Sequence, residues 1–212
     1  MKNNRRKFFM NLQYALIDFD GVLTYTRSAW AYIHGLLDLE DLAKMHKEAY
    51  SRGLIDYKDW AFIDTMLWYK SSKKILNLKP YLRPGALELL KLLKNKGLNV
   101  VIITGGLDYN KELIDKYVDY YVSNNLIYSF NEIFSVEVNV PSKEYVIEKV
   151  LNLDWSKILA IGDGEMDIPV LRKAKLSIAY NPTCVDVSNA ANIVVYSRTL
   201  YPVIKILDKL LW

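Results

Sequence analysis

Short, continuously apolar runs are the first pattern along the chain. They lie at residues 14–17, 100–103, 158–161, 176–179 and 193–195. Strands that are buried on both faces of a parallel sheet show such runs, because neither face meets water. Residues 86–96 and 143–151, which lie between the runs, have helical periodicity instead. Strands that alternate with helices predict an α/β fold with a doubly wound, Rossmann-like parallel sheet.

The segment between the first strand and the helix at 86–96 is far longer than the roughly 10 to 12 residues of a minimal crossover. Residues 38–52 and 56–69 within it have helical periodicity. We therefore predict a small helical cap at residues 25–80, inserted after the first strand into a core made of residues 1–24 and 81–212. We expect this cap to move over the site, with hinges at 24–27 and 81–85.

The predicted cap is rich in aromatic residues and holds both histidines of the chain. At helical spacing most of these aromatic residues should form the core of the cap, and one or two should line a substrate pocket. They are Trp30, Tyr32, Tyr50, Tyr57, Trp60, Trp68 and Tyr69. His34 and His46 lack metal-ligand spacing, so we expect them to be surface or packing residues.

Composition and charge narrow the class of function. The chain has 51% apolar and 25% charged residues, which is typical of a globular protein. Its net charge of +4 comes in part from Lys2, Arg5, Arg6 and Lys7. The rest of the chain is nearly neutral, so we expect no nucleic-acid partner. Nucleic-acid binding through the basic N-terminus remains an alternative, and it predicts a steep dependence on salt.

Cysteine content and hydropathy give expectations about location. Cys184 is the only cysteine, which excludes an internal disulfide and argues against a zinc site. A reducing cytoplasm fits this best. No uninterrupted apolar run approaches the roughly 20 residues that span a bilayer. We therefore expect a cytoplasmic protein without a membrane partner.

Polar residues follow three of the predicted strands. These stretches are Asp18-Phe19-Asp20-Gly21, Thr104-Gly105-Gly106 and Gly162-Asp163-Gly164-Glu165-Met166-Asp167. In a doubly wound sheet, ligands bind beyond the carboxyl ends of the strands, so the three stretches predict one site. Four carboxylates in one cleft would repel one another without a cation, and a set of oxygen ligands favours Mg²⁺.

The stretch Asp18-Phe19-Asp20-Gly21-Val22-Leu23-Thr24 resembles the first motif of the haloacid dehalogenase superfamily of phosphatases. The other motifs have matches in the expected order: Thr104 after an apolar strand, Lys143 at the start of a helix, and the acidic stretch at 162–167. The resemblance covers nearly the whole chain from about Tyr14 onward. Thr104-Gly105-Gly106 and the helical insertion are most similar to the phosphoserine phosphatase branch.

This resemblance implies a Mg²⁺-dependent phosphatase that hydrolyses a small phosphomonoester through an aspartyl-phosphate intermediate. It implies that Asp18 is the nucleophile and that Asp20 is the general acid and base. The implied metal ligands are Asp18, the main-chain carbonyl of Asp20, Asp163 and, directly or as an orienting group, Asp167. The implied phosphoryl-binding residues are Thr104, Gly105, Gly106 and Lys143, with Lys149 and Lys157 as alternatives to Lys143.

Two other functions fit the same fold. A phosphotransferase would use the same aspartyl-phosphate and pass the phosphoryl group to an alcohol in place of water. A non-catalytic regulatory protein would need to have lost a catalytic group, and Asp18, Asp20, Thr104, Lys143 and Asp163 are all present. The sequence is compatible with a monomer or a homodimer.

The sequence departs from the phosphoserine phosphatase branch at two charged positions. In that branch, the position nine after the nucleophile typically bears a Glu that meets the substrate ammonium, and a cap Arg meets its carboxylate. This chain has Arg27 at the first position, and an ungapped match puts Asp64 at the second. We therefore predict that phosphoserine is a poor substrate, and that Arg27 binds an anionic or hydroxylated leaving group. Alternatively, Arg27 pairs with Asp64 or another cap carboxylate and only holds the cap shut.

Overall fold

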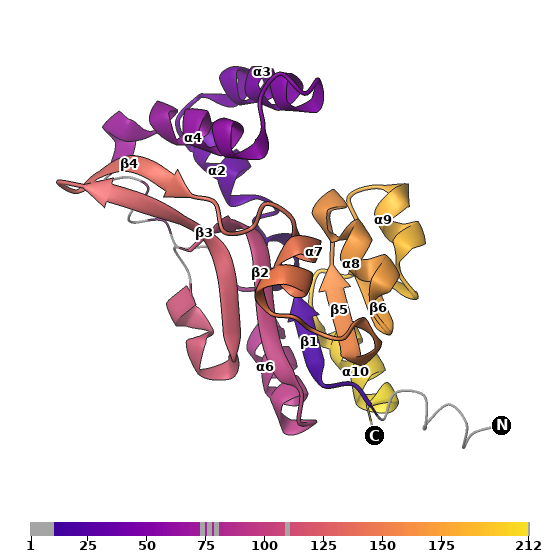
Figure 1. Ribbon diagram of the computed structural model, residues 1–212. Helices are drawn as coiled ribbons and strands as arrows, with labels where there is room; N and C mark the ends of the chain where they lie inside the picture. The colour runs from indigo at the N-terminus through magenta and orange to yellow at the C-terminus, as the bar shows by residue number, and fades with distance from the viewer. Residues whose placement is uncertain (1–10, 73–74, 76–77, 79–80, 109–110, 212) are drawn as a thin grey trace.

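The computed structural model describes residues 11–72, 75, 78, 81–108 and 111–211. Within these residues the chain forms a mostly parallel sheet of seven strands in the order β4-β3-β2-β1-β5-β6-β7 (Figure 1). The strands are β1 (Tyr14–Ile17), β2 (Asn99–Leu107), β3 (Tyr120–Ser129), β4 (Glu132–Glu137), β5 (Ile158–Gly162), β6 (Leu176–Tyr180) and β7 (Ile193–Val195). The predicted α/β fold is confirmed, and the apolar runs correspond to β1, β2, β5, β6 and β7.

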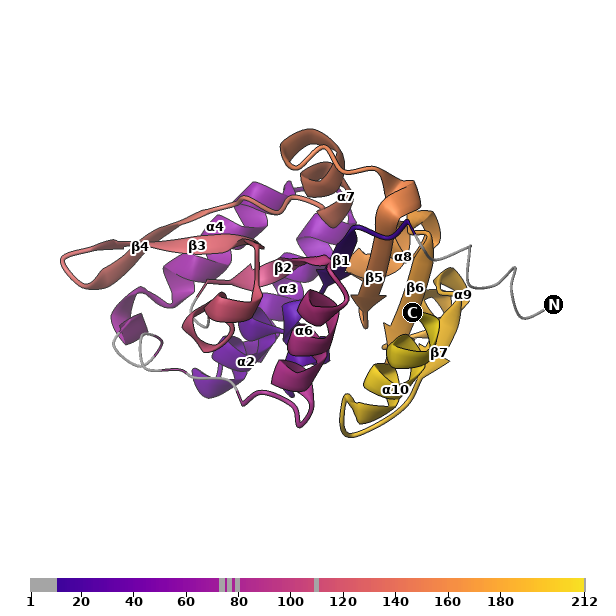
Figure 2. The ribbon, with the colours of Figure 1, turned by 90° about the horizontal axis from the view of Figure 1, so that it is seen from below.

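Helices cover both faces of the sheet (Figure 2). One face packs against α6 (Ala86–Asn95) and α10 (Tyr201–Leu210), and the other against α7 (Lys143–Tyr145), α8 (Ile168–Lys173) and α9 (Val185–Ala190). A π-helical segment at Val146–Val150 continues α7, so the helix predicted at 143–151 is present in two parts. Successive residues of β1 face opposite cores, with Ile17 in the first and Leu16 in the second. This burial on both sides explains why the strands are continuously apolar.

The register of the central strands brings the polar stretches to one edge of the sheet. Ile17 of β1 lies opposite Ile102 of β2 and Ile161 of β5, and all three strands run parallel. Asp18 follows β1 directly and Asp163 follows β5, so both leave the sheet at its carboxyl edge.

Helices α2 (Ala29–Leu36), α3 (Glu40–Ser51) and α4 (Tyr57–Leu67) lie beyond this edge, followed by a 3₁₀ turn at Tyr69–Ser71 (Figure 1). Helices α3 and α4 confirm the periodicity at 38–52 and 56–69. The two passages between core and helices lie side by side, because Thr24 forms an antiparallel bridge with Leu82 and the Arg83 amide donates to the Leu23 carbonyl at 2.8 Å. The predicted hinges therefore fall on one paired stem, and hinge motion itself stays a prediction.

The β3–β4 hairpin was not predicted from the sequence. Its two strands pair antiparallel through a two-residue turn, in which Phe130 and Asn131 both have positive φ, at 51° and 66°. A turn of this type favours Asn-Gly or Asp-Gly, so Phe-Asn gave no clear turn signal. The hairpin reaches the helices that follow β1: Leu126 of β3 and Ile133 of β4 share a buried core with Ala29, Ile33 and Trp68.

The aromatic residues between α2 and the 3₁₀ turn have mixed environments. Trp68 is fully buried, whereas Tyr32, Tyr50 and Tyr69 are 40–50% exposed. Tyr32, Tyr50 and Tyr69 thus lie at the surface of these helices, although the Tyr50 ring still stacks on Trp60 with 4.9 Å between the ring centres.

Two expectations concern the ends and surface of the molecule. The basic stretch with Lys2, Arg5, Arg6 and Lys7 lies outside the described residues. Among the residues that the structure describes, none of the helices combines the length and apolar character needed to cross a bilayer.

Candidate active site

Asp18 lies at the carboxyl end of β1, where its amide donates to the Ile161 carbonyl of β5 at 3.0 Å. One carboxylate oxygen accepts from the Phe19 amide at 2.7 Å, and the other lies 2.8 Å from Lys143 Nζ. Burial raises the pKa of Asp18 well above its usual value, the charge of Lys143 opposes this, and the charges of Asp167 and Asp163 add to it. Asp18 is thus a desolvated carboxylate whose orientation is fixed by the strand end.

The chain turns sharply after Asp18, over Phe19–Leu23, and Gly21 makes this turn possible. Its φ of 77° lies in the left-handed region, and a Cβ at this position would lie 2.1 Å from Asp163 Oδ2. Gly21 is therefore required twice, once for the backbone conformation and once for the close approach of Asp163. The Arg83 side chain is 8% exposed and donates to the Gly21 carbonyl through Nε and Nη2, at 3.3 and 3.2 Å.

Asp20 is buried and lies within this turn. Its Oδ2 accepts from the Ala29 amide of α2 at 2.8 Å. Burial raises the pKa of Asp20 to about 6, against the hydrogen bond from Ala29 and the charge of Lys143. A carboxyl group that titrates near neutral pH can both donate and accept a proton, as a general acid and base must.

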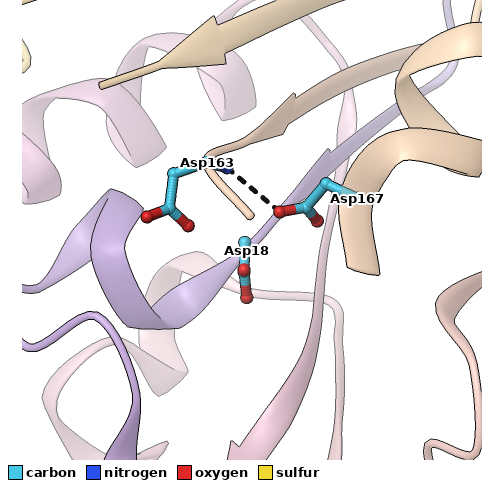
Figure 3. A group of neighbouring side chains, drawn as sticks. All are labelled: Asp18, Asp163 and Asp167. Carbon is cyan, nitrogen blue, oxygen red and sulfur yellow. Dashed lines mark hydrogen bonds between the residues drawn. The ribbon is translucent and has the colours of Figure 1, made fainter. Parts of the chain in front are cut away.

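Three carboxylates gather at the carboxyl edge: Asp18, Asp163 and Asp167 each have an oxygen within 4.8 Å of the others (Figure 3). Asp167 is held in place because its Oδ2 accepts from the amides of Asp163 and Gly164, both at 3.0 Å. Burial raises the pKa of Asp163 to about 7, with a further rise from the charge of Asp167. The side chain of Asp20 is not part of this group, and the role of its main-chain carbonyl as a metal ligand stays a prediction.

Lys143 is the cation of this cluster, although it is only 4% exposed. Its Nζ lies 2.6 Å from Asp167 Oδ1 as well as 2.8 Å from Asp18 Oδ2, and these charges raise its pKa despite burial. The structure thus places Lys143 in the site. Three carboxylates face this one lysine, so the cluster carries excess negative charge when all three are ionised. Three oxygen donors with excess negative charge fit a divalent cation such as Mg²⁺.

Thr104, Gly105 and Gly106 lie beside Asp20, but they are part of β2 and do not follow it as predicted. Strand β2 extends to Leu107, and its register with β3 is broken between Ile103 and Leu107. The Gly106 amide donates to Thr104 Oγ1 at 3.0 Å, and a Cβ on Gly106 would lie 2.6 Å from Asp20 Oδ2. The absence of a side chain at Gly106 therefore keeps this surface open next to the general acid candidate.

Arg27 is exposed at the rim of the site, and its charge lowers the pKa of Asp163. Asp64 does not face the site as the charge-reversal argument assumed. It is 2% exposed and lies on α4, where His46 Nδ1 of α3 lies 2.7 Å from its Oδ1 and His34 Nε2 of α2 lies 3.6 Å from its Oδ2. The alternative pairing of Arg27 with Asp64 is therefore wrong, because the histidines occupy that carboxylate. Only Arg27 of the two reversed charges lies near the acidic cluster.

The two histidines differ from each other. His46 is an ion-pairing and packing residue, as expected. His34 is buried, and its Nε2 has no hydrogen-bond partner within the described residues, so it is not a satisfied packing residue.

Sequence reasoning missed Arg83 and Asn124. Arg83 donates to the Gly21 carbonyl, and its Cζ lies 4.6 and 5.4 Å from the ring centres of Tyr25 and Tyr180. Asn124 is fully buried on β3 and contacts Gly105. Arg83 lies in the predicted hinge and gave no separate signal. Asn124 lies in the hairpin, whose strands the apolar runs did not reveal.

Comparison with known proteins gives a consistent result. A family model for haloacid dehalogenase-like hydrolases matches residues 12–175. A phosphoserine phosphatase of Methanocaldococcus jannaschii is 28% identical over 204 residues, which are 90% of this chain and 95% of that protein. A phosphoserine phosphatase of Lactococcus lactis is 28% identical over 144 residues, 61% of this chain and 64% of that protein. A solved structure described as a phospho-aspartyl intermediate analogue of phosphoserine phosphatase has a TM-score of 0.73 at 24% identity, and covers 92% of this chain and 99% of its own.

Proposed function

The chain belongs to the haloacid dehalogenase-like hydrolases, and from this membership we propose that it is a phosphatase that hydrolyses a small phosphomonoester through an aspartyl-phosphate on Asp18. The observation that carries the proposal is the ion-paired cluster: Lys143 lies between Asp18 and Asp167, with Asp163 beside them. The phosphoserine phosphatases among the relatives support the same chemistry.

In the first half of the reaction, the Asp18 carboxylate attacks phosphorus and the bond from phosphorus to the leaving oxygen breaks. Asp20 gives its proton to that oxygen, and its pKa of about 6 suits this transfer near neutral pH. In the second half, Asp20 takes a proton from a water that attacks phosphorus, and the bond between Asp18 and phosphorus breaks. The products are the alcohol and inorganic phosphate, and both aspartates return to their starting state.

The phosphoryl oxygens need positive charge and hydrogen-bond donors as negative charge develops on them. Lys143, Thr104 and the amides of Gly105 and Gly106 lie around Asp18 and Asp20 and would supply them. We propose that Asp18, Asp163, Asp167 and the Asp20 carbonyl hold Mg²⁺, which would add positive charge at the phosphoryl group when bound.

The relatives and the charges of this chain favour different leaving groups on the substrate. Its relatives are phosphoserine phosphatases, whose substrate carries an ammonium group. Arg27 lies at the rim near Asp163 and would repel an ammonium there. We therefore propose an anionic or hydroxylated leaving group, as in a phosphorylated small acid or sugar.

The test is a comparison of kcat/KM for phosphoserine, phosphoglycolate and a sugar phosphate with Mg²⁺ and with EDTA. We expect wild type to release phosphate only with Mg²⁺. Its kcat/KM for phosphoserine should be at least about tenfold lower than for the better of the other two substrates, the equivalent of about 1.4 kcal/mol. Arg27→Glu should narrow or reverse that preference. Activity that persists in EDTA would overturn the metal assignment, and a tenfold preference of wild type for phosphoserine would overturn the proposed leaving group.

A further inference from the structure

Asn124 is a fully buried side chain on β3 that joins three separate parts of the molecule. Its Oδ1 accepts from the amides of Asn139 and Val140, both at 3.0 Å. Its Nδ2 donates to the Gly105 carbonyl at 3.0 Å and to the Tyr57 hydroxyl at 3.4 Å. Both donors and both acceptor positions of the amide are therefore used.

The first of these parts is the bulged segment of β2. Ile103 pairs with Val122 and Leu107 pairs with Asn124, so four steps along β2 face two steps along β3. The two extra residues interrupt the ladder at the glycine pair, and their backbone groups need other partners. The Gly105 carbonyl finds them in Asn124 Nδ2 and in Trp30 Nε1 of α2, the latter at 2.9 Å.

The second part is the segment that leads to Lys143. Val140 lies three residues before Lys143 in the chain. Between them, Ser142 Oγ accepts from the Tyr145 amide at 3.1 Å, and α7 begins there. The two hydrogen bonds to Asn124 thus fix the backbone from which Lys143 reaches Asp18. The third part is Tyr57, the first residue of α4, which brings the helical insertion to the same amide.

We propose that Asn124 is a positioning residue, which fixes residues 104–106 against the segment that carries Lys143 and ties both to α4 through Tyr57. The inference rests on the proposed function, because these two segments supply the donors for the phosphoryl group. Donors on separate segments stabilise a transition state only when their spacing is held, and a misplacement of about 1 Å can cost about 10²-fold in rate. Asn124 acts through these segments, so its loss should lower kcat more than it raises KM.

The kinetic test compares Asn124→Ala with Asn125→Ala, the adjacent residue on β3, which is half-exposed and bonds to Glu137. We expect Asn124→Ala to lower kcat by about 10- to 100-fold, with a smaller change in KM, at a temperature where the protein stays folded. Asn125→Ala should behave as wild type. Tyr57→Phe removes only the link to α4, and we expect it to raise KM more than it lowers kcat. A kcat of Asn124→Ala within about threefold of wild type would overturn the proposal.

Amide hydrogen exchange gives a readout that does not depend on activity. Asn124→Ala should speed exchange at residues 104–107 and at 139–143 together. Asn124→Asp, a second variant that keeps the side-chain volume and the acceptor oxygen, should at pH 8 speed exchange only at 104–107. Faster exchange confined to β3 would overturn the proposal. A wild-type protein without phosphatase activity would instead refute the proposed function, and the exchange data would still decide the role of Asn124.

Discussion

Three neighbouring carboxylates lie around one buried lysine at the centre of the site, and two of them, Asp18 and Asp167, pair with it. Desolvation makes each isolated charge costly, and the charge of Lys143 is compensated here by Asp167 and Asp18, whose oxygens lie 2.6 and 2.8 Å from its Nζ. The raised pKa values of Asp18 and Asp163 show that the carboxylates remain destabilised as ions. The residues that give the site its chemistry therefore lower the stability of the fold.

Asp18→Asn separates the contribution of this carboxylate to activity from its effect on the stability of the fold. Without the carboxylate no aspartyl-phosphate can form, so we expect activity to fall by at least about 10³-fold. Because the pKa of Asp18 is raised in the folded state, loss of its charge should leave the melting temperature unchanged or higher. Assays of activity and thermal unfolding check both, with Asp186→Asn, at an exposed position of α9, as the control. A variant that retains a tenth of the wild-type activity would show that Asp18 is not the nucleophile.

Gly21→Ala tests the close approach of Asp163. Alanine at a φ of 77° is strained by about 1–2 kcal/mol, and its Cβ would push Asp163 out of the cluster. We expect lower stability together with a higher Mg²⁺ requirement. Gly53→Ala is a matched control, because Gly53 has a φ of 70° and nothing within 4 Å of an added Cβ. Equal Mg²⁺ requirements in the two variants would contradict the role given to Gly21.

At the scale of elements, the buried strands could be predicted from the sequence, and the β3–β4 hairpin, which depends on local strand pairing, could not. Strands β1, β2, β5 and β6 lie between two helical layers, so their apolar runs are clear, and the edge strand β7 has such a run although Val194 is 41% exposed. The β3–β4 hairpin has one face in solvent, with Phe134 62% exposed beside the buried Ile133. Its turn also lacks glycine, so neither the runs nor the turn residues indicated it.

The same distinction applies to the candidate site. Asp18, Asp20, Asp163 and Lys143 could be placed because they lie at strand ends or helix starts within recognisable motifs. Asn124 gave no such signal, because its role depends on a register break between β2 and β3 that no local pattern encodes. Asp64 misled the alignment of charges, since its partners His34 and His46 come from two other helices.

Asp64, His34 and His46 join α4, α2 and α3. From this group we predict that the stability of the fold depends on pH. Burial lowers the pKa of His34 below its usual 6.5, against the charges of Asp64 and Glu40, while His46 adds to the lowering. The unfolded chain then binds the proton more readily, so stability falls as the pH drops below 6.5, by at most about 1.4 kcal/mol per pH unit. Burial raises the pKa of Asp64, which acts in the opposite direction as the pH falls through that pKa.

Urea unfolding of wild type and His34→Phe between pH 7.5 and 5 isolates the histidine. We expect the stability of wild type to decrease more steeply below pH 6.5 than that of the variant, which has no titrating group at this position. Parallel curves would mean that folding does not shift the pKa of His34, and would contradict the lowered pKa.

At the scale of the whole molecule, the hairpin and the helices between β1 and α6 form one packed unit, although they are far apart in sequence (Figure 1). The Ile133 amide donates to Ser72 Oγ at 2.8 Å, and its side chain shares a core with Ala29 and Trp68. The helices that follow β1, which fall within the cap predicted at 25–80, therefore have a structural partner outside that range. A movement of the helices over the site would have to carry the hairpin or break this core.

Ile133→Ala tests this coupling. Truncation of a fully buried isoleucine leaves a cavity and should lower the free energy of unfolding by about 2–5 kcal/mol. Because the cavity opens onto α2 and Trp68, amide exchange there should accelerate along with that of β4. Phe134→Ala, one residue further on the exposed face, should change stability by less than about 0.5 kcal/mol. If exchange in Ile133→Ala increased in β3 and β4 alone, the helices and the hairpin would be independent units, and the helices could close over the site by themselves.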